Sequence, residues 1–136
     1  KPYDIPSEGK IIQSKVGEKL IYQRDVRLAI NRFFLSDFKC EINTEHNTFL
    51  AQKSNLPFME AHHFIPMKYQ FLFSNPLDNL SNIVCLCPTC HRAFHHAKAE
   101  NKYNLINQIY VKRPELHTYS VEYIAQFYNC LNIIKI

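Results

Sequence analysis

Cysteine and histidine are crowded into the middle of this chain. The protein has 136 residues with 5 Cys and 7 His, and ten of these twelve residues fall between positions 40 and 96. Because the number of Cys is odd, disulfide bonds cannot pair all of them. The interleaved His residues favour transition-metal binding in a reducing compartment instead. We therefore expect a metal-binding cytoplasmic protein.

The composition is typical of one globular domain. A hydrophobic content of 46% and a charged content of 21% argue against disorder. No apolar stretch approaches the roughly 18 residues of a membrane span, and no signal peptide is present, so we expect no membrane partner. The chain contains only 2 Gly, which excludes a Gly-rich phosphate loop and a dinucleotide fingerprint. Since the chain does not begin with Met, we expect it to be one domain of a longer protein.

The net charge of +4 is distributed unevenly. Residues 1–39 carry 8 basic and 5 acidic side chains, residues 40–97 carry 3 and 4, and residues 98–136 carry 5 and 3. The basic excess therefore flanks the Cys/His segment. This distribution is compatible with a polyanion such as DNA lying across a site that itself holds a cation. A charge that only maintains solubility explains it equally well.

Residue patterns indicate a helix near the N-terminus. Two Pro and one Gly within residues 1–14 are typical of an arm or linker. From about residue 20 to residue 38, hydrophobic residues recur with helical spacing, which predicts an amphipathic helix. Its polar face would carry Arg24, Arg27 and Arg32.

The second half of the chain is predicted to contain strands and then helices. The runs PFMEAHHFIP and LDNLSNIVCL each indicate one short strand. Pro88 suits the first turn of a helix that continues to about residue 98. Further helices are predicted at about 101–112 and 120–131, with Ser120 as the N-cap of the last.

Cys87 and Cys90 form half of a zinc site, because two thiolates separated by two residues can bind one tetrahedral ion. Cys40 and His46 lie in a predicted loop and can complete the set. We infer a structural Zn²⁺ site made of Cys40, His46, Cys87 and Cys90, which would stabilise a domain with few strands. The alternative is that Cys40 and Cys87 are buried thiols. Cys85 falls in a strand and is interpreted as a small buried residue.

Four other histidines form a second group. His91 and His95 lie four residues apart on a predicted helix, so both imidazoles face the same side and can share a metal ion. His62 and His63 are neighbours in a strand, where successive side chains point to opposite faces. If both serve one site, the backbone must kink there. His96 would point away and be solvated. A His pair on a surface helix is often incidental, but four His beside a zinc half-site favour a functional centre.

The segments CEINTEHNTF, FMEAHHFIPM and LDNLSNIVCLCPTCHRAFHH together resemble the HNH nucleases of the ββα-metal (His-Me finger) superfamily. The resemblance is greatest to the zinc-containing branch of bacterial restriction endonucleases, which includes enzymes that cut modified-cytosine DNA. Its core spans residues 40–96, and a weaker resemblance covers most of the chain. The sequence departs from the family at Asn43, where many relatives have a second Cys. His46 is the expected replacement.

The resemblance implies the fold class and the domain limits. We expect an α+β fold, in which a ββα-metal finger with its structural zinc site is flanked by an N-terminal helix and C-terminal helices. The HNH endonuclease domain would occupy residues 15–136, with its core at 40–97, after a linker or arm at 1–14.

The resemblance also implies residue roles. His63 would be the general base. Asn82 would be the middle letter of the motif and would pin the loop between the two strands, with Asn79 as the competing choice. A catalytic divalent cation (Mg²⁺, Mn²⁺, Ni²⁺ or Zn²⁺) would be held by three imidazoles, those of His62, His91 and His95. Arg92 is a candidate phosphate contact, although a solvated position suits it equally.

The chemistry of phosphodiester hydrolysis agrees with these roles. A neutral imidazole can accept a proton from water near pH 7, and one cation held by three side chains retains positions for phosphate and water. Glu60 and Asp78 are the only acidic residues near the motif, too few for a two-metal site. Glu60 could serve as a hydrogen-bonding partner of a ligand or as an occasional ligand.

We therefore expect a metal-dependent DNA endonuclease of a restriction or defence system, acting by a one-metal mechanism. Double-strand cleavage would require a homodimer, and a fused recognition domain would supply specificity. The alternative is a non-catalytic, zinc-stabilised DNA-binding module. A zinc deaminase is excluded because its H-x-E and P-C-x-x-C order is absent, and H-E-x-x-H is absent as well.

Overall fold

The computed structural model describes residues 7–17 and 19–130 and has a mixed α/β fold. An N-terminal hairpin of β1 (Gln13–Val16) and β2 (Lys19–Tyr22) precedes helix α1 (Val26–Leu35). After a long loop come β3 (Glu60–His63), β4 (Ile83–Leu86) and helix α2 (Pro88–His96). Helices α3 (Ala99–Tyr110) and α4 (Val121–Ala125) follow. The predicted order of helix, two strands and helices is thus confirmed.

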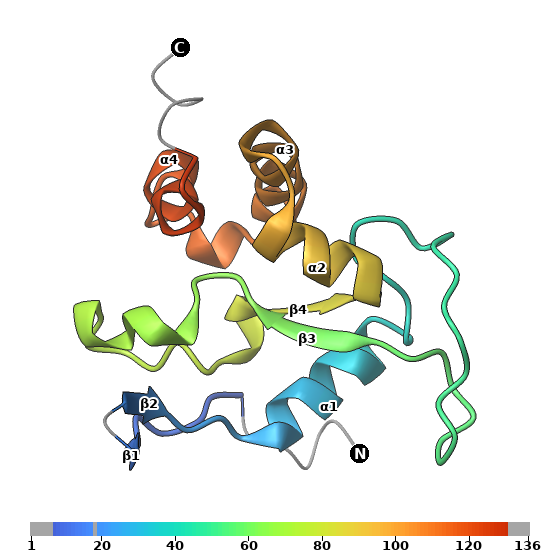
Figure 1. The fold of residues 1–136 in the computed structure, drawn as a ribbon, viewed down its shortest axis with the longest axis horizontal. Coiled ribbons are helices and arrows are strands. Elements are labelled where there is room, and N and C mark those ends of the chain that lie inside the picture. Colours follow the sequence, from blue (N-terminus) through green and yellow to red (C-terminus); the bar gives the residue numbers. More distant parts are fainter. Residues whose placement is uncertain (1–6, 18, 131–136) are drawn as a thin grey trace.

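The sheet formed by β3 and β4 lies between helices (Figure 1). The two strands pair antiparallel, with His62 opposite Val84 and His63 opposite Ile83. Figure 1 shows α1 on one face of this sheet and α2 on the other, with α3 and α4 beyond α2. Every residue of β4 is buried, because its apolar run Ile-Val-Cys-Leu faces helices on both sides. Val84, Cys85 and Leu86 of this strand pack with Phe64, Phe94, Ile106 and Ile124 in the core.

Helix α1 is shorter than predicted, and the face that it buries differs from the predicted one. It begins after Asp25, whose side chain accepts a hydrogen bond from the Arg27 backbone N–H as an N-cap. The hairpin occupies residues that were expected to be arm or helix. The buried side chains of α1 are Leu28 and Asn31, whereas an apolar stripe of Val26, Ile30 and Phe34 is exposed. The predicted polar face was therefore wrong for Arg32, whose guanidinium donates to the Leu80 carbonyl at 2.6 Å.

A buried ion pair joins the loop after α1 to the C-terminal part of the chain. The Arg113 Nη2 atom lies 2.8 Å from the Glu41 Oε1 atom, and both side chains are almost fully shielded. Arg113 also donates to the carbonyl oxygens of Ser81 and Ile83, and Glu41 Oε2 accepts from the Cys85 N–H. These bonds fix the start of the loop against β4.

The predicted helix starts are confirmed at two positions. Pro88 occupies the first turn of α2. The Ser120 hydroxyl accepts from the Tyr123 N–H at the start of α4. The last helix is shorter than expected, because α4 ends at Ala125 and a 3₁₀ turn follows over Gln126–Tyr128. Asn129 then adopts a left-handed conformation, which ends the helix.

Within the part of the chain that the structure describes, no helix combines the length and the apolar character that crossing a membrane requires.

Candidate metal centre and active site

The structure brings Cys40, His46, Cys87 and Cys90 together. One ligand atom from each lies within 4.8 Å of all the others. The His46 Nδ1 atom is 3.3 Å from the Cys90 Sγ atom and 3.7 Å from the Cys87 Sγ atom. Such a cluster can hold a metal ion, and three thiols with one imidazole form a donor set that Zn²⁺ prefers. The set joins the loop after α1 to the first turn of α2.

Two thiols of this cluster, those of Cys40 and Cys90, shift each other's pKa in opposite directions. Hydrogen bonding from Cys90 lowers the pKa of Cys40, and the same contact raises the pKa of Cys90. A thiolate is therefore favoured at Cys40, as metal ligation requires. Cys85 is different: it is fully buried in β4, and burial raises its pKa to about 12. It remains a neutral apolar side chain, as predicted.

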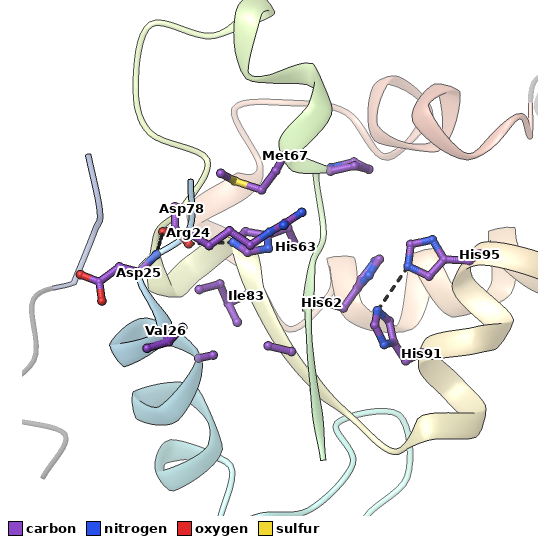
Figure 2. A pocket seen from close by; sticks show the side chains of 13 residues that line it. Arg24, Asp25, Val26, His62, His63, Met67, Asp78, Ile83, His91 and His95 are labelled. Atoms are coloured by element: carbon purple, nitrogen blue, oxygen red, sulfur yellow. Dashed lines mark hydrogen bonds and ion pairs between the residues drawn. The ribbon is translucent and has the colours of Figure 1, made fainter. Parts of the chain in front are cut away.

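A second group of histidines lines a cavity of about 410 Å³. His62, His91 and His95 each offer one nitrogen within 4.8 Å of the others. Figure 2 shows these three imidazoles on one side of β3 and His63 on the other. Strand β3 remains regular through both His62 and His63, so the expected kink is absent. No kink is needed, because the cavity is lined from both sides of the strand.

A tyrosine orients His62. The Tyr128 hydroxyl donates its only proton to the Phe64 carbonyl oxygen, so toward His62 it can only accept. His62 Nε2 lies 2.7 Å from that hydroxyl oxygen and therefore carries the proton, which leaves the Nδ1 lone pair free. Burial lowers the pKa of His62 well below its ordinary value, with further lowering by His91 and His95. His62 is thus neutral, as a metal ligand must be.

A carboxylate orients His91 in the same way. The Nδ1 atom of His91 lies 2.7 Å from Oε1 of Glu60. Because a carboxylate accepts, Nδ1 carries the proton and Nε2 is free. That Nε2 atom lies 3.2 Å from Nε2 of His95, and burial lowers the pKa of His95. A donor set of three imidazoles fits a divalent transition-metal ion.

His63 is held by an aspartate on the opposite side of β3. Its Nε2 atom lies 2.8 Å from the Asp78 Oδ1 atom, and the two side chains are 10% and 3% exposed. The carboxylate accepts the Nε2 proton, so the Nδ1 atom of His63 has the free lone pair. Arg24 lines the same cavity and lies on this side of the strand (Figure 2). This side can therefore accept a proton and bind an anion.

The amide of Asn82 spans the loop between β3 and β4. Its Oδ1 accepts from the Ile65 N–H at 2.8 Å, and its Nδ2 donates to the carbonyl oxygens of Ile65 and Leu77 at 2.9 Å. Asn79 instead caps the short turn that contains Asn82. The bonds across the loop thus belong to Asn82.

A neighbouring hollow of about 300 Å³ continues the cavity toward the C-terminal helices. The two share Arg24 and His95, and Lys68 and Lys102 line the second. None of the described residues that line it is acidic. Arg92, the predicted phosphate contact, is exposed on α2 and lies outside the lining of both.

Sequence reasoning missed three residues of the site. Asp78 was visible as an acidic residue near the motif, but nothing in the sequence pairs it with His63. Tyr128 lies 66 residues after its partner His62, and Arg24 was assigned to a helix face. No sequence pattern near these three residues predicts their role, because the tertiary fold places each of them in the site.

Comparison with known proteins identifies the central segment. Residues 40–98 match the sequence model of a family described as HNH endonuclease. The chain is also 38% identical, over 72 residues, to the type IV methyl-directed restriction enzyme EcoKMcrA of Escherichia coli (strain K12). This match covers 53% of the chain but only 23% of that enzyme. The resemblance found in the sequence motifs is thereby confirmed, and the match to the HNH endonuclease family lies in residues 40–98.

Proposed function

We propose that the chain is the cleavage domain of a metal-dependent DNA endonuclease in a restriction or defence system. The observation that carries this proposal is one cavity that two kinds of histidine line. Three imidazoles lie close enough together to share a metal ion, and a fourth, His63, is hydrogen-bonded to an aspartate. We take residues 15–136 as the domain, with β3, β4 and α2 as its ββα-metal finger. A homodimer or a fused recognition domain would complete the nuclease.

In this proposal His62, His91 and His95 hold one divalent cation, which is Mg²⁺, Mn²⁺, Ni²⁺ or Zn²⁺. A cation bound there supplies positive charge that stabilises the phosphate in the transition state. The chain supplies the remaining chemistry. The His63 Nδ1 atom accepts a proton from the attacking water while its Nε2 proton stays hydrogen-bonded to Asp78.

Two further groups position these residues. Asn82 fixes the loop that follows β3 through its bonds to Ile65 and Leu77, and Leu77 precedes Asp78. Glu60 holds His91 from outside the cavity. A structural Zn²⁺ is proposed to bind the cluster of Cys40, His46, Cys87 and Cys90. It would fix the start of α2 and hence the position of His91 and His95 on that helix.

The basic lining of the cavity and of its neighbour supports DNA as the substrate. Arg24, Lys68 and Lys102 line the neighbouring hollow together with His95, and we call these four residues the cationic path. A phosphodiester backbone carries a negative charge at each phosphate. Arg92 is proposed to contact a more distant phosphate from the exposed side of α2.

The test is divalent-cation-dependent nicking of supercoiled plasmid DNA. We expect the wild-type protein to cleave with at least one of Mg²⁺, Mn²⁺, Ni²⁺ and Co²⁺, and His63→Ala to lose at least about 100-fold in rate. Zinc content should not change in His63→Ala, because His63 belongs to neither metal cluster. The melting temperature should fall, because Asp78 loses a buried hydrogen bond, so the two rates are compared well below both melting temperatures. His96→Ala is the matched control, since His96 is an exposed histidine on α2, and it should cleave normally.

Two outcomes would contradict the proposal. Full activity of His63→Ala would show that His63 is not the general base. Failure of the wild-type protein to cleave with any of the four cations, while it still binds DNA, would favour a non-catalytic zinc-stabilised DNA-binding module.

A further inference from the structure

The segment that precedes the matched region of the chain contacts the group that orients His63. The Oδ2 atom of Asp78 accepts a hydrogen bond from the Asp25 N–H at 2.7 Å, while Oδ1 lies 2.8 Å from His63 Nε2. Both carboxylate oxygens therefore have a partner. Asp25 lies before α1, outside residues 40–98, so the HNH region alone does not contain all of this arrangement.

A glycine of the same segment lies against Asp78. The Gly9 N–H donates to the Asp78 carbonyl oxygen at 2.6 Å, and Leu80 N donates to the Ser7 carbonyl oxygen at 2.9 Å. A Cβ atom placed on Gly9 would lie 2.8 Å from the Asp78 Oδ2 atom. Among the described glycines, the positive φ belongs to Gly17 and not to Gly9. Glycine is needed at position 9 for space, because any side chain there would push the carboxylate away from His63.

Burial strengthens the hydrogen bond between Asp78 and His63. Asp78 is 2% exposed, and its neighbour Leu77 is held by Asn82 from the other side. A hydrogen bond shielded from water is stronger than an exposed one and fixes the direction of the imidazole more tightly. Movement of Asp78 would allow His63 to rotate or to exchange its proton between its two ring nitrogens.

We propose that Asp78 is a positioning residue for His63 and that the upstream segment, through Gly9 and the Asp25 N–H, holds Asp78 in place. The segment thereby becomes part of the catalytic arrangement although it lies outside the HNH region. This inference rests on the proposed role of His63 as the general base. It predicts that changes at residue 9 affect proton transfer without touching metal or DNA.

The first part of the experiment is kinetic. Asp78→Asn has one oxygen where two acceptors are needed, so we expect kcat for plasmid nicking to fall about 100-fold with KM unchanged within a factor of two. Gly9→Ala should lower kcat about 10-fold with the same KM, because the added methyl group displaces Asp78. Asp37→Asn is the matched control, since Asp37 is an exposed aspartate, and its kcat should equal that of the wild-type protein.

The second part measures the imidazole directly. Nitrogen-15 NMR of histidine-labelled protein, with His63→Ala used for assignment, should report the Nε2–H tautomer of His63 in the wild-type protein and in Asp37→Asn. A mixture of tautomers is expected in Asp78→Asn and in Gly9→Ala. This measurement needs no cleavage, so it tests the positioning even if the proposed nuclease function fails.

The result that overturns the inference is a wild-type tautomer together with wild-type kcat in both variants. If Asp78→Asn does not fold, Gly9→Ala decides by the same two readouts. A fall in kcat with an unchanged tautomer would assign Asp78 a different role and would also overturn it.

Discussion

At the scale of single residues, the imidazoles that face the cavity follow a common pattern. His62, His63 and His91 each have one ring nitrogen whose proton a protein group accepts, and the other nitrogen keeps its lone pair; in His91 that second nitrogen faces the His95 Nε2 atom at 3.2 Å. The bound partner selects the tautomer, and the tautomer decides whether the free nitrogen can bind a metal ion or accept a proton. The partners are a hydroxyl, a carboxylate and a second carboxylate, from three separate parts of the chain.

The role of Tyr128 can be tested by Tyr128→Phe. This variant keeps the ring that packs on Phe94 and His62 but removes the acceptor for the His62 Nε2 proton. We expect the affinity for Mn²⁺ or Ni²⁺ to fall about 10-fold, measured by calorimetric titration of the zinc-containing protein. Tyr123→Phe is the control, because Tyr123 packs through its ring on Tyr119. Equal affinities of the two variants would contradict the role of Tyr128.

The sequence predicted which residues could bind metal and that Glu60 could hydrogen-bond a ligand, as it does with His91, but it did not predict the other partners. Spacing was sufficient for Cys87 with Cys90 and for His91 with His95, because a helical turn places such pairs side by side. It could not reveal Asp78 or Tyr128, since their contacts join positions 15 and 66 residues apart. Long-range partners depend on tertiary packing, for which a single sequence has no periodic signal.

At the scale of secondary-structure elements, the same limit applies to α1. Its hydrophobic spacing correctly predicted a helix. The buried face was assigned wrongly, because Asn31 and Arg32 are drawn inward while Val26, Ile30 and Phe34 remain exposed. Strand β4 was easier to predict, because an apolar run without alternation is typical of a strand that is covered on both faces.

The four-ligand cluster connects the loop after α1 to the first turn of α2. Cys90→Ala should release the structural zinc and lower the melting temperature by about 10 °C, because the loop that contains Cys40 and His46 loses its attachment to α2. Zinc content by mass spectrometry and thermal unfolding are the measurements. Cys85→Ala serves as the control and should keep its zinc, since Cys85 lies in β4 outside the cluster. Retention of one zinc per chain in Cys90→Ala would contradict the assignment.

At the scale of the whole molecule, the cationic path past His95 should govern DNA binding. The double variant Lys68→Glu with Lys102→Glu should raise the Kd for duplex DNA at least about 10-fold at 100 mM salt, and it should flatten the dependence of log Kd on log salt by about two. Fluorescence anisotropy at four salt concentrations measures both quantities. Lys53→Glu with Lys98→Glu is the charge-matched control, because both lysines are exposed and lie outside this path. An equal loss in the two double variants would indicate a general charge effect.

The hydrogen bond between His62 and Tyr128 has a consequence for the time at which the site forms during synthesis. The carboxylate that orients His63 lies 15 residues after it, whereas Tyr128 is added 66 residues after His62. Until then, the nascent chain lacks the hydroxyl that fixes the buried imidazole. A chain released before Tyr128 would therefore carry a His62 imidazole whose tautomer is not selected by this hydroxyl.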